Sequence, residues 1–119
     1  MFAPLNNSAA IPSSITVLTN AVLGINSPVV PANTVIILTN FIVANVTGAP
    51  HTFSLHLHLV GVAPVAANAI CLAVPIAANT MYMMGPIVIS AGYQLSGVAD
   101  ANTAINICVG GYILNEATA

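Results

Sequence analysis

The clearest pattern of apolar and polar positions in this chain is a strict alternation over residues 51–59. One side of the alternation holds His51, Phe53, Leu55, Leu57 and Leu59, and the other holds Thr52, Ser54, His56 and His58. A period of two places successive side chains on opposite faces of an extended chain. The pattern therefore predicts a β-strand with one apolar face and one polar face.

The rest of the chain also favours short strands. It is rich in Val, Ile and Thr, whose branched side chains suit strands, and Pro or Gly interrupts it at short intervals. We expect further strands at residues 15–23, 34–46, 69–74, 80–84, 87–89, 93–98 and 104–114. Short strands joined by such turns predict an all-β fold, an antiparallel two-layer β-sandwich of the jelly-roll kind.

Three of the predicted turns share an Ala-Asn-Thr motif, at residues 32–34, 78–80 and 101–103. Asn tolerates the left-handed backbone conformation and its side chain bonds to the nearby backbone, so it suits a corner. Thr then begins the following strand. The motif therefore predicts a corner at each Asn.

The ends of the chain differ from its centre. Residues 1–14 are interrupted by Pro4, Pro12 and several Asn and Ser residues, which predicts an extended, flexible N-terminal arm. This segment has no basic stretch followed by a long apolar core, so we expect no secretory signal. Residues 15–114 are expected to form the sandwich domain, and residues 115–119 a C-terminal tail.

Charge is nearly absent from the chain. It has no Lys or Arg and only two acidic residues, Asp100 and Glu116, whereas about a quarter of an average globular protein is charged. Nucleic-acid binding depends on cations that displace counterions from phosphates, so nucleic acid is excluded as a partner. With 58% hydrophobic residues, much of the surface must be apolar or neutral, and such a surface favours contact with copies of itself or with partners.

High hydropathy also raises the question of a membrane-spanning segment. The most apolar stretch, residues 60–78, contains Pro64, Asn68 and Pro75. A spanning helix needs about 20 consecutive apolar residues, and the segment between the two prolines is about half as long. We therefore expect no membrane partner.

Two histidines are the candidate metal ligands. His56 and His58 lie two residues apart on the polar face of the predicted strand, and three such pairs around a trimer axis could supply six nitrogens. The alternative is a pair of polar residues that face solvent or a neighbouring subunit. His51, beside Pro50, is interpreted as a structural turn residue. We expect no cofactor.

The two cysteines, Cys71 and Cys108, both fall in predicted strands and lack a C-x-x-C arrangement. They could pair if their strands were neighbours, but we expect two buried free thiols that act as small apolar side chains.

No set of residues predicts catalysis. A Cys–His pair would need an orienting third group, and none is evident. Asp100 opens a predicted turn, where its side chain would cap backbone N–H groups, and Glu116 lies in the tail. Asn45-Val46-Thr47 matches a glycosylation acceptor, but a turn Asn explains it better. We therefore expect that the protein is not an enzyme.

Several side chains are candidate interface anchors. Met81 and Met83 share one face of a predicted strand, and one face of that strand should contact a partner because methionines adapt to irregular surfaces. Amphipathic tyrosine rings are favoured at interfaces. We predict Met83, Tyr93 and Tyr112 as interface residues.

Three segments resemble small β-sandwich structural proteins of tailed bacteriophage virions. These segments are SPVVPANTVIILTNFIVANVTGAPHTFSLHLHLV, AVPIAANTMYM and GPIVISAGYQLSGVADANTAINICVGGYIL, which together cover roughly residues 28 to 114. The resemblance consists of a strand leading into a Pro-Ala-Asn turn, a long strand ending in Ala-Asn-x-Thr-Gly, a Thr-Phe-Ser-Leu-His-Leu strand and a Ser-Ala-Gly-Tyr-Gln-Leu segment. The resemblance assigns a functional role to no residue of this chain. The chain also differs from the usual pattern of these phage proteins because it has no Lys or Arg.

The resemblance implies a non-enzymatic role on the exterior of a phage particle. Proteins of this kind are capsid decoration (cement) proteins or tail and fibre components, and they are commonly trimeric. We therefore expect a capsid decoration protein that forms a homotrimer and contacts the major capsid protein or other virion proteins. The alternative is a tail or fibre component that binds a receptor or a carbohydrate, although the chain has no Trp and only 5% aromatic residues.

Overall fold

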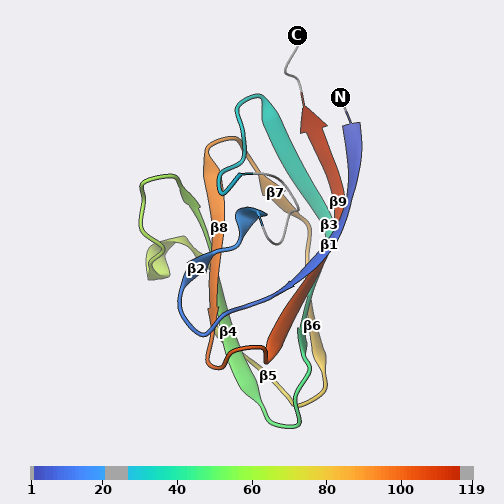
Figure 1. The fold of residues 1–119 in the computed structure, drawn as a ribbon, viewed down its shortest axis with the longest axis vertical. Helices are drawn as coiled ribbons and strands as arrows, with labels where there is room; N and C mark the ends of the chain where they lie inside the picture. Colours follow the sequence, from blue (N-terminus) through green and yellow to red (C-terminus); the bar gives the residue numbers. More distant parts are fainter. Residues whose placement is uncertain (1, 21–26, 116–119) are drawn as a thin grey trace.

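Two antiparallel β-sheets form the computed structural model of the chain, which describes residues 2–20 and 27–115 (Figure 1). In spatial order, sheet A contains β1 (Phe2–Ala10), β9 (Ile105–Asn115), β3 (Thr34–Asn45) and then both β6 (Met81–Met84) and β7 (Ile87–Ile89). In the same way, sheet B contains β2 (Thr16–Val17), β8 (Tyr93–Ala99), β4 (His51–Leu59) and β5 (Ala69–Ile76). The all-β sandwich predicted from the sequence is confirmed.

The strands pair in a nested order. β4 pairs with β5, β3 with β6 and β7, β2 with β8, and β1 with β9, so the first half of the chain pairs with the second half from the middle outwards. The pairs alternate between the two sheets, which is what a long hairpin gives when it is rolled into two layers. This is the jelly-roll arrangement, with β6 and β7 together occupying one strand position.

β3 keeps its apolar side chains in the core along its whole length because it contains a β-bulge. Thr34, Ile36 and Leu38 are buried in the first half, and Phe41, Val43 and Asn45 in the second. The register with β9 shifts between Leu38 and Asn40, which leaves Thr39 as the extra residue. The extra residue shifts the alternation of side chains by one position. The buried side chains of both halves therefore lie on the same face of sheet A.

The core lies between the two sheets. It contains the inward side chains of both sheets and four residues from the irregular segments, Ile11, Leu18, Val30 and Ala104. The largest fully buried side chains are Phe41, Phe53, Ile11, Ile36, Leu38, Leu55, Ile89, Leu95, Ile105 and Ile107. Within the described residues, no buried polar side-chain atom lacks a hydrogen-bond partner. A single apolar core with satisfied polar groups is what a stable domain of this size requires.

The N-terminal segment is extended, as predicted, but it belongs to the sandwich. Phe2–Ala10 pairs with β9 along its whole length and forms the outer strand of sheet A. The expectation of a free arm over residues 1–14 is therefore wrong for this part of the chain. Pro4 is tolerated because an edge strand needs its backbone N–H groups on one side only.

Most other predicted strands are confirmed, with small changes at their ends. β4 has the predicted bounds, and β5 extends past Pro75 to Ile76, where a turn was expected. The strand expected at residues 15–23 is reduced to Thr16–Val17, and residues 21–23 of that prediction lie outside the described residues. The expected tail begins inside β9, at Asn115, and residues 116–119 also lie outside the description.

The Ala-Asn-Thr turns are confirmed as corners at two of three places. Asn33 and Asn79 have φ values of 58° and 55°, in the left-handed region. At the third turn the left-handed residue is Thr103, with φ of 59°, and not Asn102. Asn102 instead accepts a hydrogen bond at Oδ1 from the backbone N–H of Ser13, at 2.8 Å, and so fixes the chain after β1.

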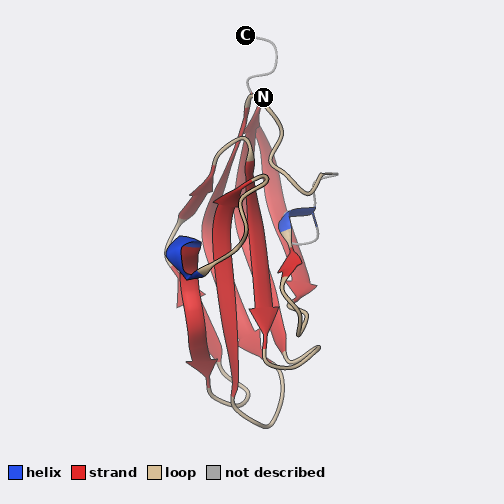
Figure 2. Ribbon diagram, turned by 90° about the vertical axis from the view of Figure 1, so that its left-hand side faces the viewer, coloured by secondary structure: helices blue, strands red, loops and turns tan. Residues whose placement is uncertain are grey.

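The segment between β4 and β5 contains a turn of 3-10 helix, η1 (Ala66–Asn68). It lies on the outer side of sheet B, away from the core (Figures 1 and 2). Across residues 2–20 and 27–115, the structure contains no helix with the length and hydropathy needed to traverse a bilayer.

Candidate interaction surface

The polar face of β4 is buried, because η1 and the loop before it cover it. His56 and His58 are each only 4% exposed. His56 Nδ1 lies 2.9 Å from the carbonyl oxygen of Val65 and 3.2 Å from Asn68 Oδ1, and both are acceptors, so Nδ1 carries the proton. The interpretation of these histidines as facing solvent or a neighbouring subunit is therefore wrong.

His58 is bonded at both ring nitrogens. Its Nδ1 lies 3.2 Å from the carbonyl oxygen of Leu59, and its Nε2 lies 2.7 Å from Ser96 Oγ. Since a carbonyl only accepts, Nδ1 donates, and in the neutral ring the Ser96 hydroxyl donates to Nε2. This Ser–His pair borders a recess of about 260 Å³ lined also by Ile15, Val17, Val62 and Pro64. Ser96 is only 1% exposed, so the pair serves as an internal hydrogen bond.

These bonds also bear on the prediction that His56 and His58 bind a metal ion. His58 has no ring nitrogen left for a metal ion, because both are used within the chain. Among the residues that the structure describes, no three His, Cys, Asp or Glu side chains gather where they could hold a metal ion. The structure therefore does not support His56 and His58 as a metal pair.

The two cysteines are free thiols, as predicted, but only one of them is buried. Cys71 lies in β5 with its Sγ 3.7 Å from Met84 Sδ, and burial raises the pKa of its thiol. Cys108 lies in β9 and is exposed, which corrects the prediction that both are buried. The reason is the alternation of β9, which turns Ile107 and Val109 towards the core and Cys108 away from it.

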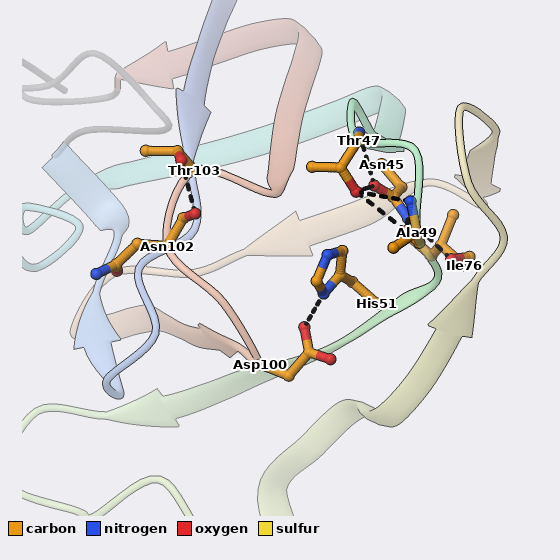
Figure 3. Close-up of polar contacts among 8 residues, drawn as sticks. All are labelled: Asn45, Thr47, Ala49, His51, Ile76, Asp100, Asn102 and Thr103. Carbon is orange, nitrogen blue, oxygen red and sulfur yellow. Dashed lines mark hydrogen bonds and ion pairs between the residues drawn. The ribbon is translucent and has the colours of Figure 1, made fainter.

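Asn45 is the centre of a hydrogen-bonded corner at the end of β3 (Figure 3). Its amide nitrogen donates to the carbonyl oxygens of Ala49 and Ile76, at 2.8 and 3.1 Å. Its Oδ1 accepts from the N–H and the hydroxyl of Thr47, at 3.0 and 2.8 Å. The interpretation of Asn45 as a turn residue is confirmed.

The chain's one described acidic residue pairs with a histidine. His51 Nδ1 lies 2.8 Å from Asp100 Oδ1, between the start of β4 and the end of β8 (Figure 3). The predicted capping role of Asp100 is therefore wrong, since its side chain holds the His51 ring. Glu116 lies outside the described residues.

The outer face of sheet A is apolar and uncovered. Strand register places side chains in rows across this face, for example Val88 beside Ile37 beside Tyr112, and Met83 beside Ile42 beside Cys108. Its members are Val35, Ile37, Ile42, Ala44, Met81, Met83, Val88, Cys108, Tyr112 and Leu114. We call this set the A face. In Figure 1 no described segment lies beyond sheet A on the side away from sheet B.

The A face reverses the usual arrangement of a two-layer sandwich. Sheets that face water on one side normally carry polar side chains there. Here Met81, Met83 and Val88 are 63%, 68% and 55% exposed, and none of the ten side chains is charged. On sheet B the outward residues His56, His58 and Ser96 are polar, and the chain itself covers them. The A face is therefore the candidate interaction surface.

The predicted interface residues fall in different places. Met83 and Tyr112 lie on the A face, Met83 exposed and Tyr112 half-buried. Tyr93 begins β8 in sheet B and packs partly against the core, so it lies apart from the other two. Of the methionines, Met84 is the one that packs inwards, while Met81 and Met83 share the outer face.

Sequence reasoning missed most of the A face. Val35, Ile37, Ile42 and Ala44 belong to a run that is apolar at nearly every position, which is typical of a strand buried on both sides. That signal was present at residues 34–46, but the sequence does not say which face remains bare.

Comparison with protein-family models and with curated proteins found no match for this chain.

Proposed function

We propose that this chain is a non-enzymatic structural protein of a tailed-phage virion. In this proposal it is a capsid decoration (cement) protein on the exterior of the particle, which associates as a homotrimer and contacts the major capsid protein or other virion proteins. The resemblance of residues 28–114 to small phage β-sandwich proteins supplies the virion context. The A face supplies the physical argument.

The observation that carries the proposal is the bare, uncharged A face. An exposed apolar surface of this extent marks a contact site in soluble proteins, because water solvates it poorly. A protein that stabilises a shell acts through contact area and shape complementarity, and it needs no reactive group.

The polar side chains support the same proposal. The Ser96–His58, Asn45 and His51–Asp100 interactions all join one part of the chain to another. Each holds a loop or strand end in place. The recess beside the Ser96–His58 pair, at about 260 Å³, is smaller than the 300–1,000 Å³ that small-molecule sites usually have.

A map of the intact particle tests the proposal. Virions of the phage that encodes this sequence would be purified, their proteins identified by mass spectrometry, and their density determined by cryo-electron microscopy. We expect the sandwich to fit density on the outer surface of the head. Absence of the protein from purified particles would contradict the proposal, and density on the tail or fibres would replace it with the alternative role there.

A further inference from the structure

We propose that the A face binds the A face of another copy of this chain. The inference rests on the part of the proposed function in which copies of the protein associate. Because the same face is used by both copies, the contact joins the copies in pairs about a two-fold axis, in place of the proposed homotrimer. Three features of the face identify this occupant: its charge, its size and its side chains.

The absence of charge on the A face favours a partner that also lacks charge. About a quarter of the residues of an average protein are charged, and a Lys or Glu pressed against this face would lose its water without gaining a counter-charge. This chain has no Lys or Arg and two acidic residues, of which Asp100 lies at the loop end beside His51. A second copy therefore meets the A face without burying an unpaired charge.

The size of the A face matches a stable protein interface. β3 has 12 residues, and at about 3.3 Å per residue it is about 40 Å long. The A face spans three strand positions, those of β9, β3 and the pair β6 and β7, and at about 4.8 Å each it is about 14 Å wide. The resulting area of about 580 Å² is close to the roughly 600 Å² that each partner buries at the lower end of the standard interface range. The A face alone is thus large enough for self-association.

The side chains of the A face suit packing against a second sheet. Sheets in sandwiches pack about 10 Å apart, with the side chains of the two faces interdigitating. Met81 and Met83 are unbranched and can adjust to the opposing surface, while Ile37 and Ile42 on the central strand β3 are rigid. Polar residues, Thr39, Asn40 and Asn106, lie among and around the apolar rows and can bond to water or to the partner.

The test compares Val88→Lys with a matched control, Leu72→Lys. Val88 lies on the A face and is 55% exposed, whereas Leu72 lies on β5 of sheet B and is 58% exposed. Both substitutions add one positive charge at an exposed apolar strand position. We expect the unmodified chain and Leu72→Lys to be oligomeric by sedimentation velocity, and Val88→Lys to associate at least about 10-fold more weakly, because like charges would meet in an apolar contact. Circular dichroism checks that both variants fold.

The exposed thiol provides an independent readout in the unmodified chain. Cys108 lies on the A face, while Cys71 is buried in the core and its pKa is raised. A maleimide should therefore label Cys108 at a rate that falls as protein concentration rises, because association covers it.

Two results would overturn the inference: Val88→Lys as oligomeric as Leu72→Lys, or labelling of Cys108 that does not depend on protein concentration. A chain that is monomeric in solution but present on virions contradicts this inference and the proposed self-association, and leaves the proposed virion role intact. Association through the A face by a protein that is absent from virions would support this inference and contradict the proposed function.

Discussion

Single polar residues hold the irregular parts of this domain in place, and Asn45 does so most fully. Its side chain is 2% exposed and makes four hydrogen bonds, to Thr47, Ala49 and Ile76. These bonds join the end of β3 to the turn before β4 and to the end of β5. Loss of the amide would remove a donor from the carbonyl groups of Ala49 and Ile76, of which Ala49 keeps the Thr47 hydroxyl, and would remove the acceptor of Thr47.

We therefore predict that Asn45→Ala lowers the free energy of unfolding by about 2–4 kcal/mol, since four hydrogen bonds of a buried side chain are lost and a small cavity forms. Asn40→Ala is the matched control, because Asn40 is exposed and should change stability by less than about 0.5 kcal/mol. Urea denaturation at equal protein concentration measures both. Equal stability of the two variants would show that the Asn45 bonds contribute little.

Local chemistry could be predicted from the sequence at this scale, and long-range contacts could not. The left-handed turns at Asn33 and Asn79 follow from the properties of Asn itself. The burial of His58 depends on Ser96, 38 residues away, and that of His56 on Val65 and Asn68 in the covering loop. No periodicity in residues 51–59 contains that information.

At the scale of elements, the central pair β3–β9 depends on a close approach at the bulge. A Cβ atom added at Gly111 would collide with the backbone carbonyl of Ile37. Gly111 faces Leu38 in the register, next to the extra residue Thr39. Only a residue without a side chain lets the two strands approach this closely.

We predict that Gly111→Ala destabilises the protein by about 2–4 kcal/mol, because the clash is with backbone and can be relieved only by moving a strand. Gly48→Ala is the control, since a Cβ there meets nothing within 4 Å. It should change stability by less than about 1 kcal/mol. Thermal unfolding of both variants is the measurement, and a Gly111→Ala protein as stable as the control would contradict the packing described for β3 and β9.

The positions of most strands could be predicted from the sequence, but that of β1 could not. The alternation at 51–59 and the apolar run at 34–46 gave the positions of β4 and β3 because those patterns are local. Phe2–Ala10 has Pro and Asn where a strand pattern is expected, and it becomes a strand because β9 offers a free edge. Whether such a segment forms a strand depends on pairing partners that are distant in the sequence.

At the scale of the whole molecule, the scarcity of charge and the bare A face belong to one explanation. Composition alone left open where the apolar surface lies. The structure places one continuous part of it on the outer side of sheet A. Further exposed apolar side chains, such as Val62, Val65 and Leu72, lie on β5 of sheet B and in the loop before it. The outer side of sheet A is thus the surface that we propose a second copy of the chain covers.

Contacts of this kind respond to salt in a characteristic way. Salt screens attraction between charges, but an interface without charges has nothing to screen. Excluded salts also raise the cost of exposing apolar surface. We predict that association of this protein persists when salt is raised to molar concentration.

Sedimentation equilibrium of the unmodified chain, at low and at molar NaCl, tests this account most directly. It predicts a mass well above the 12.0 kDa of one chain under both conditions, with no weaker association at high salt. A mass of 12.0 kDa at every protein concentration, or an oligomer that dissociates when NaCl alone is added, would contradict it.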